Sequence, residues 1–498
     1  MKTKYLLYVL LANVLIWPMG CKKILDEQPL NALTAKDALG TPANAEAALT
    51  SAYTALLPGM YYGETMNTIT ELPGDNTTTA NGARTMWDLF TFNPSTDFTQ
   101  NYNQIYNAIA KDNLILKLVP DVTMDDKRKQ EILGETYFLR ALSYFNLVRL
   151  YGGVPVYTEP VLSGDEATIN EIGLKARSSE EEVYALILDD LDKAEKMAPA
   201  TQGDASQNRF KAVTASVNAL QAKVYLTMRN WQSAKAAAQK VLSNANYSLA
   251  TDFNSLWPAE GKAESIFEID YQPPTKGGGI MPDLVLPYPL ATYSFDKYPR
   301  PADDLVNSID FTNDKRFKYL GPIMLNGAHV ADNYTSMCKG LPTSGAVDQG
   351  FFVYKFRNTG TMPFNNPDNY EILRLADIKL IYAEAENELN GPAGAFTQLN
   401  DIRVRAGLLP LTSANLPDKQ SFRNEVDKQR RLELAFEGER WFDLIRYARH
   451  ESAGGNHSIT ALDVIKKMKG SADQTYLLFP IPQTEINSNP KVKQNPGY

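Results

Sequence analysis

The chain contains few of the residues that form covalent cross-links and metal centres. Its 498 residues include two cysteines, Cys21 and Cys338, and three histidines, His329, His450 and His457. Two cysteines allow at most one disulfide, so the fold must depend on a hydrophobic core, which a chain of this length can supply. Without paired thiols, these histidines have no spacing typical of a zinc site or of a catalytic triad.

Two further absences narrow the range of partners. The net charge is −8 and no stretch forms a basic stripe, which argues against nucleic acid as a partner. The glycine-rich stretch "KGGGI" lacks the GxxxxGK[ST] spacing of a phosphate-binding loop. We therefore expect neither a nucleotide site nor any bound cofactor.

The N-terminus reads "MKTKYLLYVLLANVLIWPMGCKK", with two lysines and an apolar run from Tyr5 to Met19. This pattern is typical of a secretory signal, and the run is shorter than the ~20 residues of a membrane-spanning helix. A small residue directly before Cys21 indicates a bacterial lipoprotein that is acylated on this cysteine. Because Pro18 and Met19 depart from the usual lipobox, plain secretion is the alternative. We predict a signal peptide over 1–20 and lipidation of Cys21.

Hydrophobic periodicity predicts that most of the chain is helical. Residues 103–119 and 129–153 are amphipathic runs joined by a polar turn, and Gly152 and Gly153 end the second run. This pattern predicts an antiparallel helical hairpin. Residues 179–199 predict another core-facing helix, which begins at a Ser179 cap and stops at Pro199.

Two later stretches are similar to each other. Residues 219–242 align with residues 380–403 so that Ala222 matches Ala383 and Ala234 matches Ala395. Small residues at these offsets let paired helices approach closely, as in degenerate tetratricopeptide repeats. The predicted fold is mostly α, with such helix pairs forming a superhelical scaffold. A plain helical bundle shares the same periodicity and stays open.

Two regions have the composition of loops. The first covers about 73–98, and the second, an insertion over about 251–369, is dense in proline, glycine and tyrosine. The insertion contains short apolar pieces, "ESIFEIDY" and "FFVYKF", which predict strands. Long loops on a rigid scaffold are frequent binding sites, and the 26 tyrosines of the chain suit a wet recognition surface.

The stretch "RRLELAFEGERWFDLIR", residues 430–446, is the best candidate for catalysis because it contains four carboxylates. On one continuous helix, Arg430, Arg440 and Arg446 would lie three residues from Glu433, Glu437 and Asp443. Such pairs lower carboxylate pKa values, whereas a general acid needs a raised one. The apolar residues Leu434, Trp441, Phe442 and Ile445 form one stripe with Gly438. We interpret this stretch as scaffold fixed by ion pairs, and expect no enzyme activity.

The chain resembles the SusD/RagB family of outer-membrane lipoproteins of the Bacteroidetes type, nearly from end to end. The resemblance rests on the order of several motifs: the signal with Cys21 and "ILDEQP", then "ETYFLRALSYFNLVRLYGGVPV", "RPADDLVNSIDFTNDKRF", "LRLADIKLIYAEAENELNG", "LNDIRVRAG", the 430–446 stretch and the tail "YLLFPIPQTEINSNPKVKQNPGY". It implies a single domain over 21–498, anchored in the outer membrane and facing out. It also implies capture of oligosaccharides for a TonB-dependent, SusC-like transporter, over which the protein acts as a lid.

The resemblance points to the two loop regions for the ligand, by position and not by motif. The expected contacts in the N-terminal loop and the insertion are Asp75, Asn76, Asn81, Arg84, Trp87, Tyr288, Tyr293 and Tyr298. Some relatives also bind a structural calcium ion, for which "PADD" or "DFTND" offer oxygen ligands. Capture of oligopeptides by the same architecture is the main alternative function, and a free-standing helical scaffold or an enzyme are the others.

Overall fold

The computed structural model describes residues 39–79, 85–96, 100–162, 166–291, 299–340, 350–450, 457 and 459–498. The predicted signal peptide and Cys21 lie outside these residues, as do Asn81, Arg84, Tyr293 and Tyr298. Among the helices that these ranges contain, none combines the length and the apolar character needed to cross a membrane.

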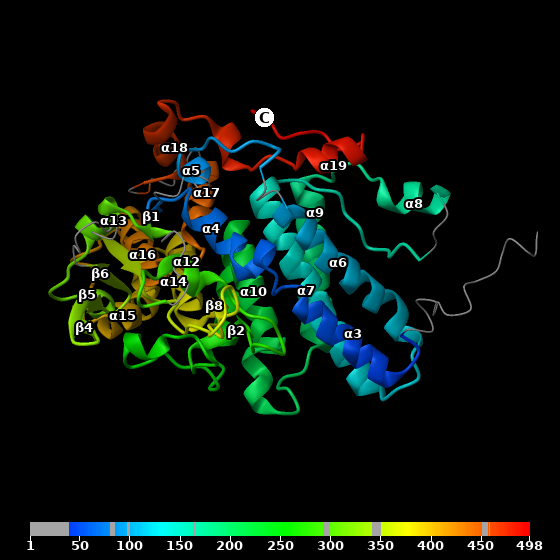
Figure 1. The fold of residues 1–498 in the computed structure, drawn as a ribbon, viewed down its shortest axis with the longest axis horizontal. Helices are drawn as coiled ribbons and strands as arrows, with labels where there is room; N and C mark the ends of the chain where they lie inside the picture. The colour runs from blue at the N-terminus through cyan, green and yellow to red at the C-terminus, as the bar shows by residue number, and fades with distance from the viewer. Residues whose placement is uncertain are drawn as a thin grey trace, which may run out of the picture.

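The N-terminal half is a series of antiparallel helices (Figure 1). Helix α3 (Pro42–Thr54) packs on α6 (Gln100–Leu118) and α7 (Asp126–Tyr151), which form the predicted hairpin. Helix α7 ends where Gly152 takes a φ of 75°. Helix α9 (Glu180–Met197) begins with a capping box between Ser179 and Glu182, as the sequence predicts, and packs along α7.

The two aligned stretches are both helix pairs. They form α10 (Thr214–Thr227) with α11 (Trp231–Leu242), and α14 (Leu375–Asn390) with α15 (Phe396–Arg405). The four matched alanines are fully buried, and α11 packs on α14, so the pairs stack as a repeat. The predicted scaffold of helix pairs is confirmed. The C-terminal part adds α16 (Lys419–Glu433), α17 (Arg440–His450), α18 (Ala461–Lys469) and α19 (Gln483–Ser488).

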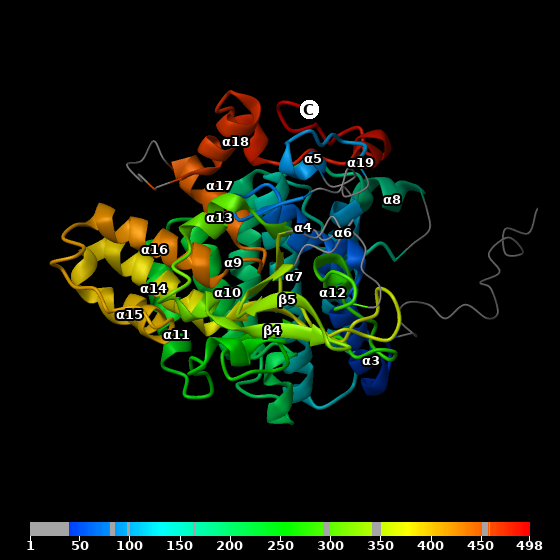
Figure 2. The ribbon, with the colours of Figure 1, turned by 60° about the vertical axis from the view of Figure 1, so that its left-hand side comes forward.

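Both predicted strands are present in the insertion, one within "ESIFEIDY" and one within "FFVYKF". Strand β2 (Ser265–Ile269) pairs antiparallel with β8 (Tyr370–Arg374), so the insertion leaves and re-enters the scaffold at one place. Between them lies a four-stranded antiparallel sheet in the order β4 (Tyr319–Leu325), β5 (Ala328–Tyr334), β6 (Met337–Gly340) and β7 (Phe351–Val353). In Figure 2 this sheet lies in front of the helices.

Short elements complete the described chain. They are the π-helix η2 (Gly59–Gly63), the helices α4 (Thr65–Glu71), α5 (Thr85–Asp88), α8 (Glu166–Gly173), α12 (Met281–Val285) and α13 (Asp303–Ser308), the strands β1 (Thr77–Thr78) and β3 (Arg300–Pro301), and the 3-10 turns η4 (Val119–Asp121), η5 (Ala205–Arg209), η6 (Phe253–Leu256), η7 (Lys315–Phe317), η8 (Pro392–Gly394) and η10 (Gln474–Leu477). One hydrophobic core includes Ile187 of α9, Ile266 of β2, Val353 of β7 and Trp441 of α17. The insertion and the scaffold therefore share a core.

The 430–446 stretch is not one helix, so that prediction is wrong. Helix α16 ends at Glu433 and α17 begins at Arg440, and between them Phe436 and Gly438 have φ values of 71° and 80°. A Cβ atom on Gly438 would lie 2.5 Å from the Tyr370 hydroxyl, which donates a hydrogen bond to the Glu437 carbonyl. Only glycine fits this turn without strain. The predicted apolar residues of the stretch are nevertheless buried, as expected.

Candidate functional site

The carboxylates of the 430–446 stretch are all held by cations. Glu433 accepts hydrogen bonds from Arg374 at 2.8 Å, from Arg316 at 3.3 Å and from Arg405. Burial alone would raise the pKa of Glu433, but these three guanidinium groups hold it well below its usual range. Such a carboxylate cannot serve as a general acid near neutral pH.

The other carboxylates of this stretch also bind cations, although burial raises the pKa of Glu439 despite its contact with Lys223. Glu437 accepts from Lys355 at 2.6 Å and from Arg374 at 2.7 Å, and Glu439 accepts from Lys223 at 2.5 Å. Asp443 accepts from Arg430 at 2.8 Å and from Arg446 at 3.0 Å.

The predicted ion pairs are correct in kind, but only one of three has the expected partners. The pair of Asp443 with Arg446 is confirmed. Arg430 binds Asp443 and Asp377 in place of Glu433, and Arg440 binds Asp75 and Asp427 in place of Glu437. The break between α16 and α17 explains the exchange for Glu437 and Arg440, because Glu437 lies in the turn and no longer shares a helix face with Arg440. Arg430 and Glu433 both lie on α16, and there partners from other segments replace the expected pair.

The first polar residues of the N-terminal loop are also part of the scaffold. Asp75 accepts hydrogen bonds from Arg440 at 2.6 and 3.0 Å. Asn76 is fully buried, and its side-chain oxygen accepts from Arg431 at 2.9 Å. These contacts hold the loop against α16 and α17. The prediction that Asp75 and Asn76 face a ligand is therefore wrong.

Trp87 belongs to the hydrophobic core. Its side chain is 2% exposed, and its ring stacks on Phe92 at 4.7 Å and meets Phe479 edge-on at 4.9 Å. The structure therefore places Trp87 in the core and not in the expected ligand contact. The sequence carried a signal for burial, because Phe90 and Phe92 follow closely in the same short segment and both are buried.

The two loop regions nevertheless meet. Strand β1 of the N-terminal loop pairs antiparallel with β3 of the insertion, so that Thr77 faces Pro301 and Thr78 faces Arg300. Arg431 strengthens this junction because it binds both Asp75 and Asp304. The N-terminal loop and the insertion therefore lie side by side at this point.

Asp88 lies at the same junction. Its carboxylate accepts from the Thr78 hydroxyl at 2.6 Å and from the Thr79 amide at 3.2 Å. Burial raises the pKa of Asp88, although both hydrogen bonds and the charge of Arg300 act against the rise. Polar contacts therefore hold β1 and β3 together at this junction.

One group of exposed side chains of the insertion belongs to the segments at α12 and at 360–366. Tyr288, which follows α12, is 73% exposed. Asp283 of α12 accepts hydrogen bonds from the Phe364 amide at 2.7 Å and from the Asn366 side chain at 2.8 Å. Phe364 and Met362 are also exposed. We call Tyr288, Met362 and Phe364 the loop face; the ribbon in Figure 2 shows the 360–366 loop beside α12.

Sequence reasoning anticipated only part of this face. It named Tyr288 but not Met362 or Phe364. The segment "TMPFNNPDNY" lies in the predicted insertion, and its proline and asparagine residues around two apolar side chains are the signal that the sequence offers. Large apolar side chains in turn-forming backbone stay exposed to solvent unless another helix, strand or loop packs over them.

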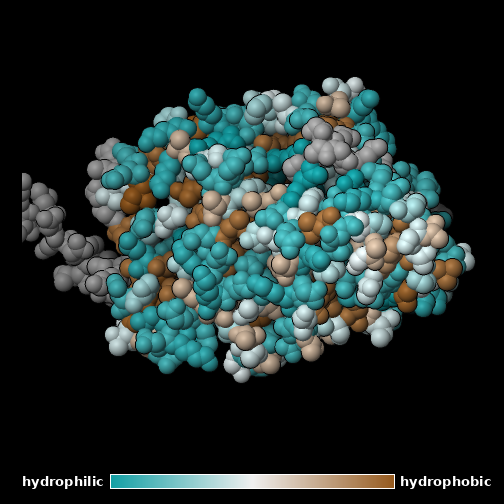
Figure 3. All heavy atoms as spheres, turned by 180° about the vertical axis from the view of Figure 1, so that it is seen from behind, coloured by the Kyte–Doolittle hydropathy of each residue, from teal (hydrophilic) through white to brown (hydrophobic). Residues whose placement is uncertain are grey.

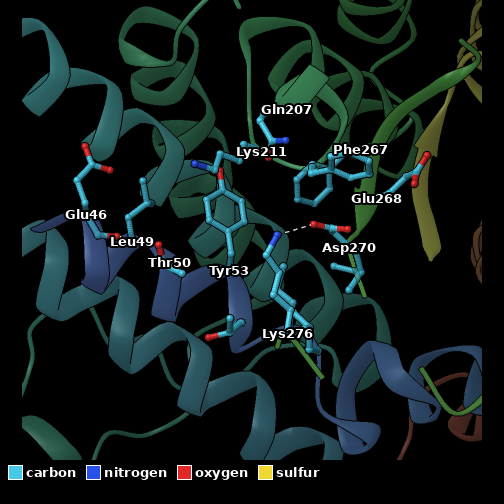
Figure 4. A pocket seen from close by; sticks show the side chains of 15 residues that line it. Glu46, Leu49, Thr50, Tyr53, Gln207, Lys211, Phe267, Glu268, Asp270 and Lys276 are labelled. Atoms are coloured by element: carbon cyan, nitrogen blue, oxygen red, sulfur yellow. Dashed lines mark hydrogen bonds and ion pairs between the residues drawn. The ribbon is translucent and has the colours of Figure 1, made fainter. Parts of the chain in front are cut away.

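A cavity of about 230 Å³ lies beside α3 (Figure 4). Its walls are Leu49 and Tyr53 of α3, Phe267 of β2 and the aliphatic part of Lys276. Several of its polar groups have protein partners: Lys276 binds Asp270 at 2.6 Å, and the Tyr53 hydroxyl donates to Glu135 at 2.7 Å.

Two of the carboxylates considered for calcium form ion pairs with arginine. Asp304 binds Arg431, and Asp314 binds Arg316. Within the described ranges no group of three or more His, Cys, Asp or Glu side chains surrounds a possible metal position. The face seen from behind in Figure 3 is mostly hydrophilic, with apolar atoms in separate groups.

Comparisons with known proteins agree with this architecture. A sequence profile described as "SusD family" matches residues 234–498, and one described as "Starch-binding associating with outer membrane" matches residues 23–226. The chain belongs to the SusD family. The resemblance drawn from its motifs is thereby confirmed.

Individual SusD relatives are distant in sequence, and the three described next cover more than 90% of the chain. "SusD-like protein P38" of Formosa agariphila is 25% identical over 96% of both chains. A solved "Laminarin binding SusD-like protein" is 26% identical, with a TM-score of 0.73 over 92% of this chain and 100% of its own. "Surface glycan-binding protein A" of Bacteroides thetaiotaomicron, in complex with laminarihexaose, is 19% identical with a TM-score of 0.70 over 91% and 99%, which shows a shared fold.

Proposed function

We propose that this SusD-family chain is a surface lipoprotein that captures oligosaccharides and passes them to a TonB-dependent, SusC-like transporter in the outer membrane, acting as its lid. Two observations carry the proposal: the two loop regions meet at β1 and β3, and the insertion exposes the ring of Tyr288. The similarity to a laminarin-binding relative supports the choice of ligand.

The loop face has the chemistry that sugar binding requires. A pyranose ring has apolar C–H faces that can lie on Tyr288 or Phe364, while its hydroxyl groups need polar partners at the edge. If one ring covers ~60 to 80 Å² of apolar surface, its burial contributes roughly 1.5 to 2 kcal/mol. Two or three such contacts give affinities between about millimolar and micromolar after the cost of association. Weak capture suits a protein that must release its ligand to a transporter.

The carboxylates of the 430–446 stretch give no support for a catalytic role. Glu433, Glu437, Glu439 and Asp443 all bind arginine or lysine, and none of them lies on the loop face. We therefore propose binding without turnover.

A glycan array probed with the full-length chain in detergent tests the choice of ligand. We expect binding to oligosaccharides and none to a parallel library of short peptides. Binding to peptides alone would favour oligopeptide capture and would overturn the proposal.

The lipid anchor is tested by fractionation of cells that express Cys21→Ala. We expect the wild-type chain in the outer-membrane fraction, accessible to protease added outside, and the variant in the soluble fraction. Retention of Cys21→Ala in the membrane would argue against acylation of this residue.

A further inference from the structure

A second cavity, separate from the loop face, lies among four scaffold helices. It has a volume of about 450 Å³ and is bounded by the ends of α7, α9, α10 and α17. Its lining includes Arg149, Tyr184, Leu188, Met228, Ile445 and Arg449. This size falls in the range of small-molecule sites.

Arg149 of α7 lines this cavity with its guanidinium group held between aromatic rings. Its guanidinium lies between two aromatic rings, 4.0 Å from the centre of Phe145 and 3.6 Å from the centre of Phe442. Its Nε donates to the Phe145 carbonyl at 3.4 Å and its Nη2 donates to the Asn146 side-chain oxygen at 2.7 Å. In the described part of the chain, Nη1 donates to no group and no carboxylate forms an ion pair with Arg149.

The other charged groups around the cavity have partners elsewhere. Arg446 binds Glu384 and Asp443, and Arg449 binds Glu180 at 2.8 Å. Glu439 acts on Arg149 at longer range, but it is held by Lys223. Glu181, the remaining charged residue of the lining, is exposed at the start of α9.

Arg149 is partly exposed, and a cation without a counter-ion at the wall of a cavity gains a charge-assisted hydrogen bond when an anion enters. Partial burial between the rings lowers the pKa of Arg149, yet an arginine remains charged. The stacked rings and the C-terminal end of α7 also interact favourably with its charge. They leave the two Nη1 hydrogens unused.

We infer that this cavity binds a small organic carboxylate. The carboxylate would accept hydrogen bonds from Nη1 of Arg149, and its apolar body would lie against Leu188, Met228 and Ile445. The carboxylate can belong to a uronic-acid sugar or to the C-terminus of a short peptide. The inference does not depend on the loop face, which lies on other elements.

Calorimetry on the full-length chain in detergent tests the inference with two pairs of probes. The first pair is galacturonic acid and its methyl ester; the second is N-acetyl-phenylalanine and its amide. We expect at least one acid to bind ten-fold or more tightly than its neutral partner, and the pair that responds identifies the source of the carboxylate. Equal binding of acid and neutral partner in both pairs, or no binding by either acid, would overturn the inference.

Variants assign the effect to Arg149. Arg149→Gln should abolish the preference for the acid, Arg149→Lys should retain part of it, and Lys196→Gln, which removes an exposed charge from α9, should leave it unchanged. Wild-type preference retained in Arg149→Gln would overturn the assignment. If Arg149→Gln does not fold, the decision rests on Arg149→Lys, whose affinity must fall several-fold. Tyr288→Ala should leave carboxylate binding intact, which separates this inference from the proposed glycan site.

Discussion

Two regions of this protein are rich in charged and aromatic residues, and they differ in how those residues are used. In the 430–446 stretch every carboxylate is bound by a cation and the aromatic rings are buried. On the loop face Tyr288 and Phe364 are exposed in irregular backbone. Composition alone therefore does not distinguish scaffold from binding surface, whereas the partners of each side chain do.

Glu433→Gln should show the largest effect, because it breaks the centre of the ion-pair network. The change leaves Arg374, Arg405 and Arg316 with less compensating charge in a fully buried place. We expect a loss at the upper end of about 3 to 5 kcal/mol in the free energy of unfolding, measured by urea denaturation.

A surface carboxylate provides the control for this change. Asp189 of α9 pairs with Lys193 at 2.6 Å, but both side chains are largely exposed. Asp189→Asn should cost less than about 1 kcal/mol. Equal losses in the two variants would contradict the assignment of 430–446 to the scaffold.

Trp87→Ala should also destabilise the protein, by about 3 to 5 kcal/mol, because it removes a buried ring from contact with Phe92 and Phe479. Thermal denaturation followed by circular dichroism measures the change. A melting temperature within a degree or two of wild type, with glycan binding lost, would return Trp87 to the list of ligand contacts.

The sequence could predict the helical scaffold because the information is local. Periodicity, the Ser179 cap, the Gly152 stop and the matched alanines each identify a helix or a helix pair without knowledge of the rest of the chain. The strands β2 and β7 were likewise predicted from short apolar pieces.

The partners of individual side chains could not be predicted, because they depend on which distant segments meet. Arg374 and Arg405 are 59 and 28 residues from Glu433 in the chain. The partner of Trp87, Phe479, comes from the C-terminal tail. The turn at Phe436 and Gly438 broke a helical pattern that looked continuous, since tertiary contacts with Tyr370 and Asn67 outweigh local preference there.

Glu71 predicts a dependence of stability on pH. Burial raises its pKa from 4.5 to about 8, although the Gly438 amide donates to one of its oxygens at 2.7 Å. The folded protein thus keeps this proton after the unfolded chain has lost it. Stability should therefore fall as pH rises from 4.5 to about 8.

Glu71→Gln removes this ionisation and keeps the acceptor for Gly438. Near about pH 4 the variant and the wild type should have similar free energies of unfolding. Between pH 4.5 and 8 the free energy of unfolding of the variant should rise relative to that of wild type by about 1.4 kcal/mol per pH unit. Denaturation in urea across this range provides the measurement. A constant difference between the two proteins would show that Glu71 is ionised in the fold.

Tyr288→Ala should have the smallest effect on stability, within about 0.5 kcal/mol, because its ring is exposed. Tyr319→Ala on β4 is a matched control, since this tyrosine is also largely exposed. A clear loss of stability in Tyr288→Ala would place its ring in a structural contact and remove it from the loop face.

Calorimetric titration of the best oligosaccharide from the array into wild type, Tyr288→Ala and Tyr319→Ala tests the central claim most directly. The loss of one ring platform, worth roughly 1.5 to 2 kcal/mol, should weaken binding about ten- to thirty-fold in Tyr288→Ala. Tyr319→Ala should bind as wild type does, and all three proteins should have similar melting temperatures. Wild-type affinity in Tyr288→Ala would place the glycan site away from the loop face and contradict the account.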